Sequence, residues 1–412
     1  MEKNPPEGSR HHEHRHRRHR RNHHRQRPRN RRPRRRPLVV EATGPADVRA
    51  AVLASRELGV PLTVQATGHG TVVPPDEGLL LKTSRMSRVL VDPSRRVARA
   101  GAGARWSDVI AAAAPLGLSP LSGSHASVGV TGFTLGGGVG WLSRRYGFAA
   151  DHLLRAEIVT ADGRHLTADA AHHADLFWAL RGGSGNFGVV TSLEFRLQPV
   201  SAVYAGVALY PAERAAAVLT RFRDEADLRP DALSVSIALA DHPAHGRVVA
   251  VRGVYAGSAA DGARALRSLR NAAGPPLEDT FRTMPYAETE SLGGTPPHHF
   301  HLYADLPDAL IDAIAASDAA GIEVKHWGGA MARPGADAGP VGHRDVPFSL
   351  TIDGSDAALA PYATGGSFLN FLHDTSRTAS AYTPENLRRL REVKRAYDPQ
   401  NVFHRNHNIQ PA

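Results

Sequence analysis

The sequence contains no cysteine, although it is 412 residues long. This absence excludes disulfides, zinc sites built on cysteine and thiol nucleophiles, and it makes the cytoplasm the expected location. Long apolar runs are also missing, so no membrane span is expected. No apolar segment follows the arginine pairs near the N-terminus, which argues against a signal peptide. We therefore expect no membrane partner, and no pattern of ligands predicts a metal site.

Positive charge is concentrated at one end of the chain. Residues 1–36 contain fourteen Arg and one Lys against three Glu, and the rest of the chain is slightly acidic. This segment has too few apolar side chains to offset the entropy of ordering, so we predict a disordered basic tail. It is either a solvated extension, a product of a misassigned start, or a segment that binds nucleic acid non-specifically by charge. No specific nucleic-acid partner is expected.

Residues 38–197 read as short strands and helices separated by glycine-rich turns. A helix is predicted over 47–58 and ends at Gly59. A second helix begins near Trp106, with Ser107 as its N-cap. A hairpin turns at Asp162–Gly163.

Residues 200–373 alternate strands with helices, which is typical of an α+β domain. A long helix follows the tyrosine at position 382. Thr383 is its predicted N-cap, and Pro384 suits its first turn.

Two glycine-rich stretches point to close contact between backbone and ligand. His69 lies between Gly68 and Gly70 after a strand, and seven glycines occur between residues 122 and 147. Glycines allow backbone N–H groups to approach an anion. The order GxGxxG is missing, so a Rossmann site is not indicated. Taken alone, the longer stretch is either a phosphate-binding loop or a structural loop, and His69 is either part of a turn or a ligand contact.

Three stretches resemble FAD-linked oxidases of the berberine bridge enzyme type, within the vanillyl-alcohol oxidase superfamily. They are GVTGFTLGGGVGWLSRRYGFAADHL, ADLFWALRGGSGNFGVVTSLEFRL and VKRAYDPQNVFHRNHNIQP. The resemblance implies an α+β fold. It implies a PCMH-type FAD-binding domain of two α+β subdomains over 37–199. It also implies an α+β substrate domain over 200–374, whose antiparallel sheet covers the flavin. Residues 375–412 would then return to the FAD domain.

The resemblance also implies residues that hold FAD. His69 matches the histidine that is joined to the flavin 8α-methyl carbon, and His125 stands where many relatives have a second, cysteinyl link. A single covalent link, through His69, is therefore expected. Val128 matches a residue that controls oxygen access, Asn406 is expected in the pocket, and Asn408 is expected to be structural. The full set of expected cofactor-binding residues is Thr67, Gly68, His69, Gly70, Ser124, His125, Val128, Gly129, Thr131, Gly132, Thr134, Gly138, Gly188, Val190, Asn406 and Asn408.

The catalytic base is not given by the resemblance, because Phe368 occupies the position of the family's tyrosine. Alternation along the strand at 299–303 puts His299, His301 and Tyr303 on one face. That face either lines the pocket or meets water, and these three are the predicted catalytic residues. Weaker candidates are Tyr286, Glu290, His326 and Tyr362, whereas His343 and Arg344 are expected to be structural.

The function implied is that of an FAD-dependent oxidase. It would transfer hydride from an alcohol or amine of a sugar or secondary metabolite to flavin N5, and O2 would reoxidise the flavin and give H2O2. The alternative is a flavin-containing drug-binding or resistance protein with little turnover. The expected partners are a small-molecule substrate and O2, and the expected state is a monomer or homodimer.

Overall fold

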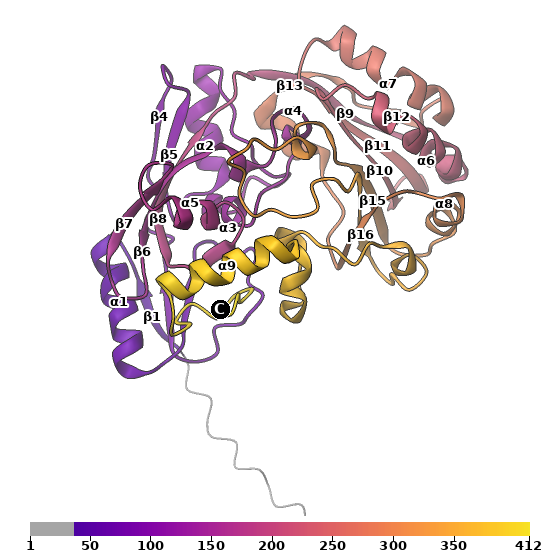
Figure 1. Ribbon diagram of the computed structural model, residues 1–412. Coiled ribbons are helices and arrows are strands. Elements are labelled where there is room, and N and C mark those ends of the chain that lie inside the picture. The colour runs from indigo at the N-terminus through magenta and orange to yellow at the C-terminus, as the bar shows by residue number, and fades with distance from the viewer. Residues whose placement is uncertain (1–36) are drawn as a thin grey trace, which may run out of the picture. The chain divides into compact units, whose positions relative to one another are not determined.

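Three sheets organise the protein in the computed structural model, which describes residues 37–412 (Figure 1). The predicted disordered tail lies outside these residues. No described helix is long and apolar enough to cross a membrane. The described residues contain both helices and largely antiparallel strands, in keeping with the predicted α+β class.

The first sheet has three parallel strands in the order β1-β3-β2. Its elements are β1 (Leu38–Glu41), α1 (Pro45–Leu58), β2 (Leu62–Gln65) and β3 (Leu79–Lys82). Helix α1 buries Val48 and Val52 in the core beneath the sheet and ends at Gly59, whose φ of 62° suits glycine. The predicted end of this helix is confirmed.

The second sheet has five antiparallel strands in the order β4-β5-β8-β6-β7. Its strands are β4 (Val89–Asp92), β5 (Val97–Gly101), β6 (Leu153–Val159), β7 (His165–Asp169) and β8 (Val189–Arg196). Helices α2 (Trp106–Ala113), α3 (Val130–Leu135) and α5 (Ala174–Leu180) pack on it, whereas α4 (Ser143–Tyr146) lies against the third sheet, described below. Gly163, at φ 81°, forms the predicted turn between β6 and β7.

The N-cap predicted for α2 is wrong. Ser107 lies inside the helix, and Arg105 occupies the N-cap position. The carboxylate of Asp108 accepts a hydrogen bond from the Arg105 backbone N–H at 2.8 Å. An acidic side chain in the first turn therefore caps this helix, rather than the serine hydroxyl.

The third sheet is antiparallel, with the order β12-β9-β11-β10-β15-β16-β14, and β13 pairs with β9. Its strands are β9 (Ala202–Pro211), β10 (Leu233–His242), β11 (Gly246–Tyr255), β12 (Glu278–Asp279), β13 (Arg282–Pro285), β14 (His299–Tyr303), β15 (Gly321–His326) and β16 (Phe348–Asp353). Helices α6 (Ala215–Asp224), α7 (Ala259–Ala273) and α8 (Asp308–Ala315) cover its outer face (Figure 1). Its other face is turned toward the glycine-rich stretch, because Phe300 and Leu302 pack with Phe148 and Val139.

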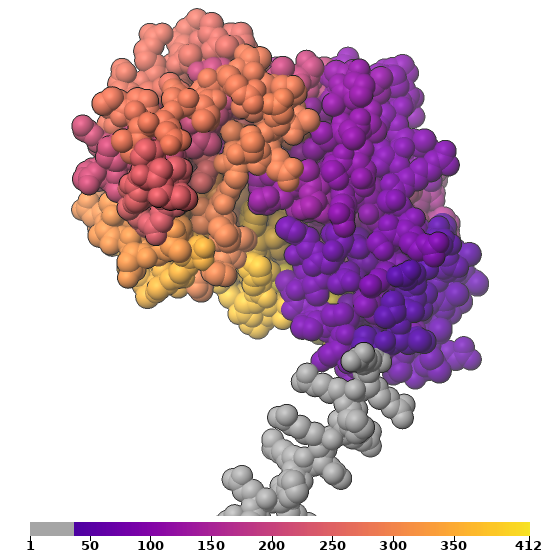
Figure 2. Space-filling model, turned by 180° about the vertical axis from the view of Figure 1, so that it is seen from behind, coloured from indigo at the N-terminus to yellow at the C-terminus, as the bar shows by residue number. Residues whose placement is uncertain are grey.

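The C-terminal part of the chain returns to the first half of the protein. Helix α9 (Pro384–Tyr397) begins at Thr383, whose hydroxyl accepts a hydrogen bond from the Asn386 backbone N–H at 3.2 Å, as predicted. Beyond it, the Asn186 side chain donates to the His407 carbonyl and accepts from the Ile409 N–H. Figure 2 shows this segment in yellow at the seam between the indigo and orange parts.

Candidate functional site

A cavity of about 390 Å³ lies where the first sheet, the glycine-rich stretch and the C-terminal segment meet. Its walls come from Thr83, Ala102 and five longer parts of the chain, within 62–73, 123–139, 184–190, 369–373 and 403–407. The volume is that of a typical small-molecule or cofactor site. Segments distant in sequence thus build one concave site.

Most of the predicted cofactor-binding residues line this cavity. They are Thr67, Gly68, His69, Gly70, Ser124, His125, Val128, Gly129, Thr131, Gly132, Gly188, Val190 and Asn406. Thr134, Gly138 and Asn408 do not line it. The Thr134 side chain is buried. Gly138 packs so tightly on Phe133 that an added Cβ would lie 2.5 Å from that ring.

His69 is exposed on the cavity wall, in the turn that follows β2. Gly68 has φ 81°, a conformation that favours glycine. The Thr71 hydroxyl donates to the Gly68 carbonyl at 3.0 Å, and this bond holds the turn. Within residues 37–412, the His69 imidazole makes no hydrogen bond, so both ring nitrogens are available to a ligand.

The glycines of the glycine-rich stretch differ in how closely they are packed. Gly140 is structural, since an added Cβ would lie 1.9 Å from the Ser122 carbonyl oxygen. Gly132 lines the cavity, and among the described residues no atom lies within 4 Å of its added Cβ. The same loop thus contains a glycine required by packing and a glycine that leaves the backbone open to the cavity.

Several buried polar atoms of the cavity wall have no hydrogen-bond partner within the described residues. They are Thr63 Oγ1, Thr131 Oγ1 and Asn406 Oδ1. Buried polar atoms without partners are rare and costly, so a ligand with hydroxyl, phosphate or ring donors and acceptors is expected against them. FAD provides all three kinds of group, and the residues present therefore fit it.

The three predicted catalytic residues do not reach this cavity. His299, His301 and Tyr303 do share one face of β14, as alternation predicted, but it is the face covered by helices. Tyr303 is fully buried, packs with the helix-side core, and donates to the Leu359 carbonyl at 3.2 Å. His301 is bonded to Asp356. The cavity side of β14 instead carries Phe300, which stacks on the cavity-lining Phe371.

The weaker candidates are also held by structural contacts or lie away from the cavity. Tyr286 is buried with its hydroxyl 2.9 Å from Ser122 Oγ, and Glu290 accepts from the Ala126 N–H at 3.0 Å. Tyr362 is exposed, and none of the four candidates lines the cavity. Arg344 pairs with Asp151 at 2.6 Å, in keeping with its predicted structural role.

Asn370 is a cavity residue that the sequence analysis missed. Its Oδ1 accepts from the Gly138 N–H at 2.9 Å, and its Nδ2 donates to the Phe133 carbonyl at 3.1 Å. It therefore joins the segment after the third sheet to the glycine-rich stretch. Asn370 lies two residues after Phe368, which occupies the position of the family's tyrosine, and this position could have indicated that Asn370 lies near the site.

A buried charged cluster on the inner face of the third sheet was also missed. Glu323 is 1% exposed, accepts from Ser236 Oγ at 2.7 Å, and lies 3.5 Å from Arg252 and 3.4 Å from Lys325. Burial acts to raise the pKa of Glu323, but Lys325 and Arg252 outweigh it and hold this pKa below its usual value. The carboxyl group is therefore ionised.

This cluster lies beside the cavity wall. A Cβ added at Gly294 would lie 3.8 Å from Ser124 Oγ, a cavity atom, and 3.9 Å from Glu323 Oε2. The Lys325 ammonium lies 5.9 Å from the ring of Trp141, in the glycine-rich stretch. The cluster combines one carboxylate with two cations, so its net charge is positive.

Comparison with known proteins agrees with this site. The family described as "FAD binding domain" matches residues 37–169, and the family "Berberine and berberine like" matches residues 367–410. (R)-6-hydroxynicotine oxidase of Paenarthrobacter nicotinovorans is 29% identical over 420 residues and 92% of each chain.

Solved structures share the architecture. That of 6-hydroxy-D-nicotine oxidase from Arthrobacter nicotinovorans has a TM-score of 0.78 at 27% identity, over 91% of this chain and 92% of that one. Glucooligosaccharide oxidase from Acremonium strictum has a TM-score of 0.77 at 22% identity, over 91% of each chain, and shares the fold. The chain belongs to the berberine bridge enzyme-like flavoproteins of the vanillyl-alcohol oxidase superfamily. It is an FAD-linked oxidoreductase.

Proposed function

We propose that the protein is an FAD-dependent oxidase whose cofactor is held by a single covalent bond from His69. The observation that carries this proposal is the imidazole of His69, which lies on the cavity wall between two glycines and has no hydrogen-bond partner among residues 37–412. When bound, FAD supplies a two-electron acceptor at flavin N5 that O2 can reoxidise with release of H2O2.

The relatives support an attachment through histidine. The Acremonium strictum enzyme is described as carrying a 6-S-cysteinyl, 8α-N1-histidyl FAD. This chain has no cysteine and places His125 on the cavity wall instead. One ring nitrogen of His69 would add to the 8α-carbon of the flavin tautomer that has lost a methyl proton, which would leave the flavin reduced, and O2 would reoxidise it. His125 would contact the cofactor without a covalent bond.

The remaining cavity residues would bind and orient FAD. Gly132 and Gly188 leave the backbone open to the ligand. Thr63, Thr131 and Asn406 offer oxygens that have no hydrogen-bond partner in the described part of the chain. Val128 is half-buried and lines the cavity, where it would limit the approach of O2.

The substrate would approach from the third sheet, toward the Glu323 cluster. Lys325 is about one-third exposed and Arg252 Nε has no hydrogen-bond partner within the described residues, so a hydroxyl or anionic group of the substrate suits them. The oxidised group would be an alcohol or amine of a sugar or secondary metabolite. The named oxidases among the relatives act on hydroxynicotine and oligosaccharides.

Acid precipitation tests the covalent bond. The wild-type pellet should stay yellow, the His69→Ala pellet should release its FAD, and the His125→Ala pellet should stay yellow as the matched control. Free FAD in the wild-type supernatant would disprove the covalent bond. Release of FAD from His125→Ala but not from His69→Ala would show that the bond is made by His125 instead of His69.

Flavin reduction tests the oxidase activity. A panel of alcohols and amines should include a compound that bleaches the flavin absorbance under nitrogen, with recovery and H2O2 on admission of air. If compounds bind but none bleaches the flavin, the alternative of a drug-binding protein with little turnover is favoured. If a compound does bleach the flavin, Lys325→Met should raise KM for that compound and leave flavin content unchanged.

A further inference from the structure

Strand β14 carries two histidines that have no role at the cavity. His299 and His301 are two residues apart, so their side chains leave the strand on the same face. Their rings are nearly parallel, with an interplanar angle of 5° and centroids 6.4 Å apart. The pair belongs to the helix-covered face of the third sheet, because His301 is opposite Leu350 of the helix-side core.

One carboxylate lies against both imidazoles. Asp356 Oδ2 is 2.7 Å from His301 Nε2 and 3.4 Å from His299 Nδ1. Asp356 follows the end of β16, the strand that pairs with β14, so the turn after that pairing brings it back over the histidines. One nitrogen from each ring and one carboxylate oxygen all lie within 4.8 Å of one another.

The two histidines of the cluster differ in exposure to solvent. His301 is 8% exposed and its position is set by packing, whereas 45% of the His299 side chain is accessible. An ion can therefore enter past His299 toward ligands that are already assembled.

We propose that His299, His301 and Asp356 bind a divalent transition metal, with Zn²⁺ as the representative ion. Two imidazole nitrogens and one carboxylate oxygen form a common zinc ligand set, which leaves a fourth position for water. Each histidine would bind the ion through the lone pair of one ring nitrogen and carry its proton on the other ring nitrogen. No redox change accompanies binding.

The bound ion would stabilise one wall of the cavity from the face of the sheet that is turned away from the cavity. It would tie β14, the last strand of the sheet, to the segment that follows β16. That segment next pairs with β14, where the Thr364 N–H donates to the Leu302 carbonyl at 2.9 Å. It then supplies the cavity residues Leu369–His373. This role is independent of the proposed oxidase activity.

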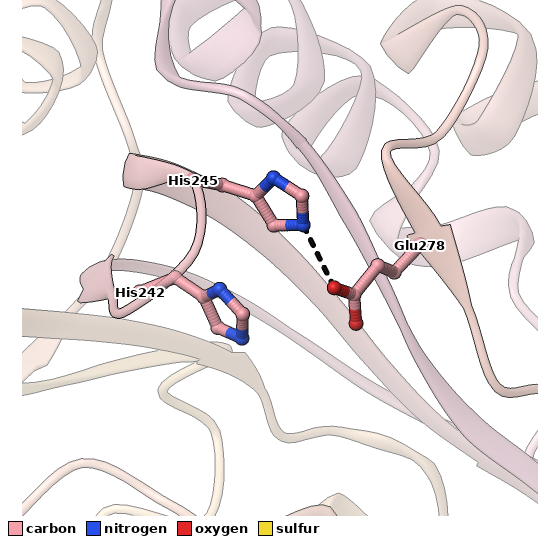
Figure 3. A group of neighbouring side chains, drawn as sticks. All are labelled: His242, His245 and Glu278. Carbon is pink, nitrogen blue, oxygen red and sulfur yellow. Dashed lines mark hydrogen bonds and ion pairs between the residues drawn. The ribbon is translucent and has the colours of Figure 1, made fainter.

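A second cluster, of two histidines and a glutamate, provides a control (Figure 3). His242 and His245 flank the turn between β10 and β11, and His245 Nε2 lies 2.7 Å from Glu278 Oε1. None of these three side chains is buried. Ordering such exposed groups costs more entropy than using a buried histidine, so weaker binding is expected here.

Zinc titration of the full chain tests the proposal. The basic tail contributes seven histidines to every variant, so the differences between proteins report on the body of the chain. Competition with a chromophoric chelator should show one fewer tight zinc equivalent in His299→Ala than in wild type. Asp356→Asn should weaken that equivalent at least about tenfold, because a neutral amide replaces an anionic ligand. His242→Ala should match wild type.

Two further measurements locate the ion and check folding. Zinc should raise the melting temperature of wild type and of His242→Ala, but not of His299→Ala. Flavin content and the circular dichroism spectrum without zinc should agree among the proteins. Anomalous scattering from zinc-soaked crystals should place a peak between His299, His301 and Asp356. Wild-type affinity and stoichiometry in His299→Ala, or a peak only at His242 and His245, would overturn the assignment.

Discussion

Lys394 Nζ lies 2.6 Å from Asp398 Oδ2, and neither side chain is exposed to solvent. The ammonium also donates to the carbonyls of Asn186 and Phe403, and the carboxylate accepts from the Val402 and Phe403 N–H groups. Burial lowers the pKa of Lys394, while the hydrogen bond and charge of Asp398 act against that shift. This pair fixes α9 to the segment that closes the cavity.

Asp398→Ala should destabilise the protein strongly. It leaves a buried ammonium without its counter-ion and two backbone N–H groups without an acceptor, which typically costs about 3–5 kcal/mol. Thermal unfolding of the apoprotein and holoprotein measures the effect. Glu392→Ala removes an exposed acid from the same helix and should leave the melting temperature nearly unchanged. Equal melting temperatures for the two variants would contradict the role of the pair.

His326 should make the free energy of unfolding depend on pH in the acid range. Burial lowers its pKa to about 2, and the nearby cations Arg144 and Arg229 act in the same direction. The unfolded chain takes up this proton near pH 6.5, but the folded chain does not. The stability contribution is therefore complete above about pH 6.5 and is lost as pH falls from there toward 2.

His326→Gln should flatten this acid dependence. Urea unfolding between pH 7 and pH 4.5 should show that the variant loses less stability than wild type, by up to about 1.4 kcal/mol per pH unit. His404→Gln replaces an exposed histidine and serves as the control. Parallel curves for wild type and His326→Gln would show that this histidine is not the group responsible.

Gly140→Ala and Gly132→Ala should separate folding from cofactor binding. The first places a methyl group 1.9 Å from a backbone oxygen, so the loop must shift and little folded protein is expected. The second meets no protein atom within 4 Å but enters the cavity, so the protein should fold with reduced FAD content. Soluble yield and the ratio of flavin to protein absorbance measure the two effects. Full FAD content in Gly132→Ala would argue against cofactor contact there.

Val128→Ile tests the proposed control of oxygen access. The extra methylene should cost about 1–3 kcal/mol at most in a packed site. Stopped-flow spectroscopy should show slower reoxidation of the reduced enzyme, with reduction by substrate close to wild type. Unchanged reoxidation would make Val128 an ordinary packing residue.

Local signals in the sequence predicted local structure well. The end of α1 at Gly59, the turn at Gly163 and the cap at Thr383 each depend on one residue type suited to one backbone geometry. Ser107 failed as a cap because the helix begins one residue earlier, at Trp106, where the Asp108 carboxylate of the first turn accepts from the Arg105 N–H.

Contacts between distant segments could not be read in the same way. Alternation put His299, His301 and Tyr303 on one face of a strand, but both faces of this sheet are covered, by helices on one side and by the glycine-rich stretch on the other. Glu323 alternates with apolar residues and so resembles a solvent-facing position. Only its partners from β10 and β11 show that the charge is buried.

The two walls of the cavity are translated at very different times. Residues 62–73 form one wall, but Phe403, Arg405, Asn406 and His407 form another, and Asn186 holds that wall through His407 and Ile409. A nascent chain exposes the His69 turn long before the opposite wall emerges from the ribosome. The complete cavity can therefore enclose its cofactor only after translation has passed residue 409, and attachment at His69 is expected to be a post-translational event.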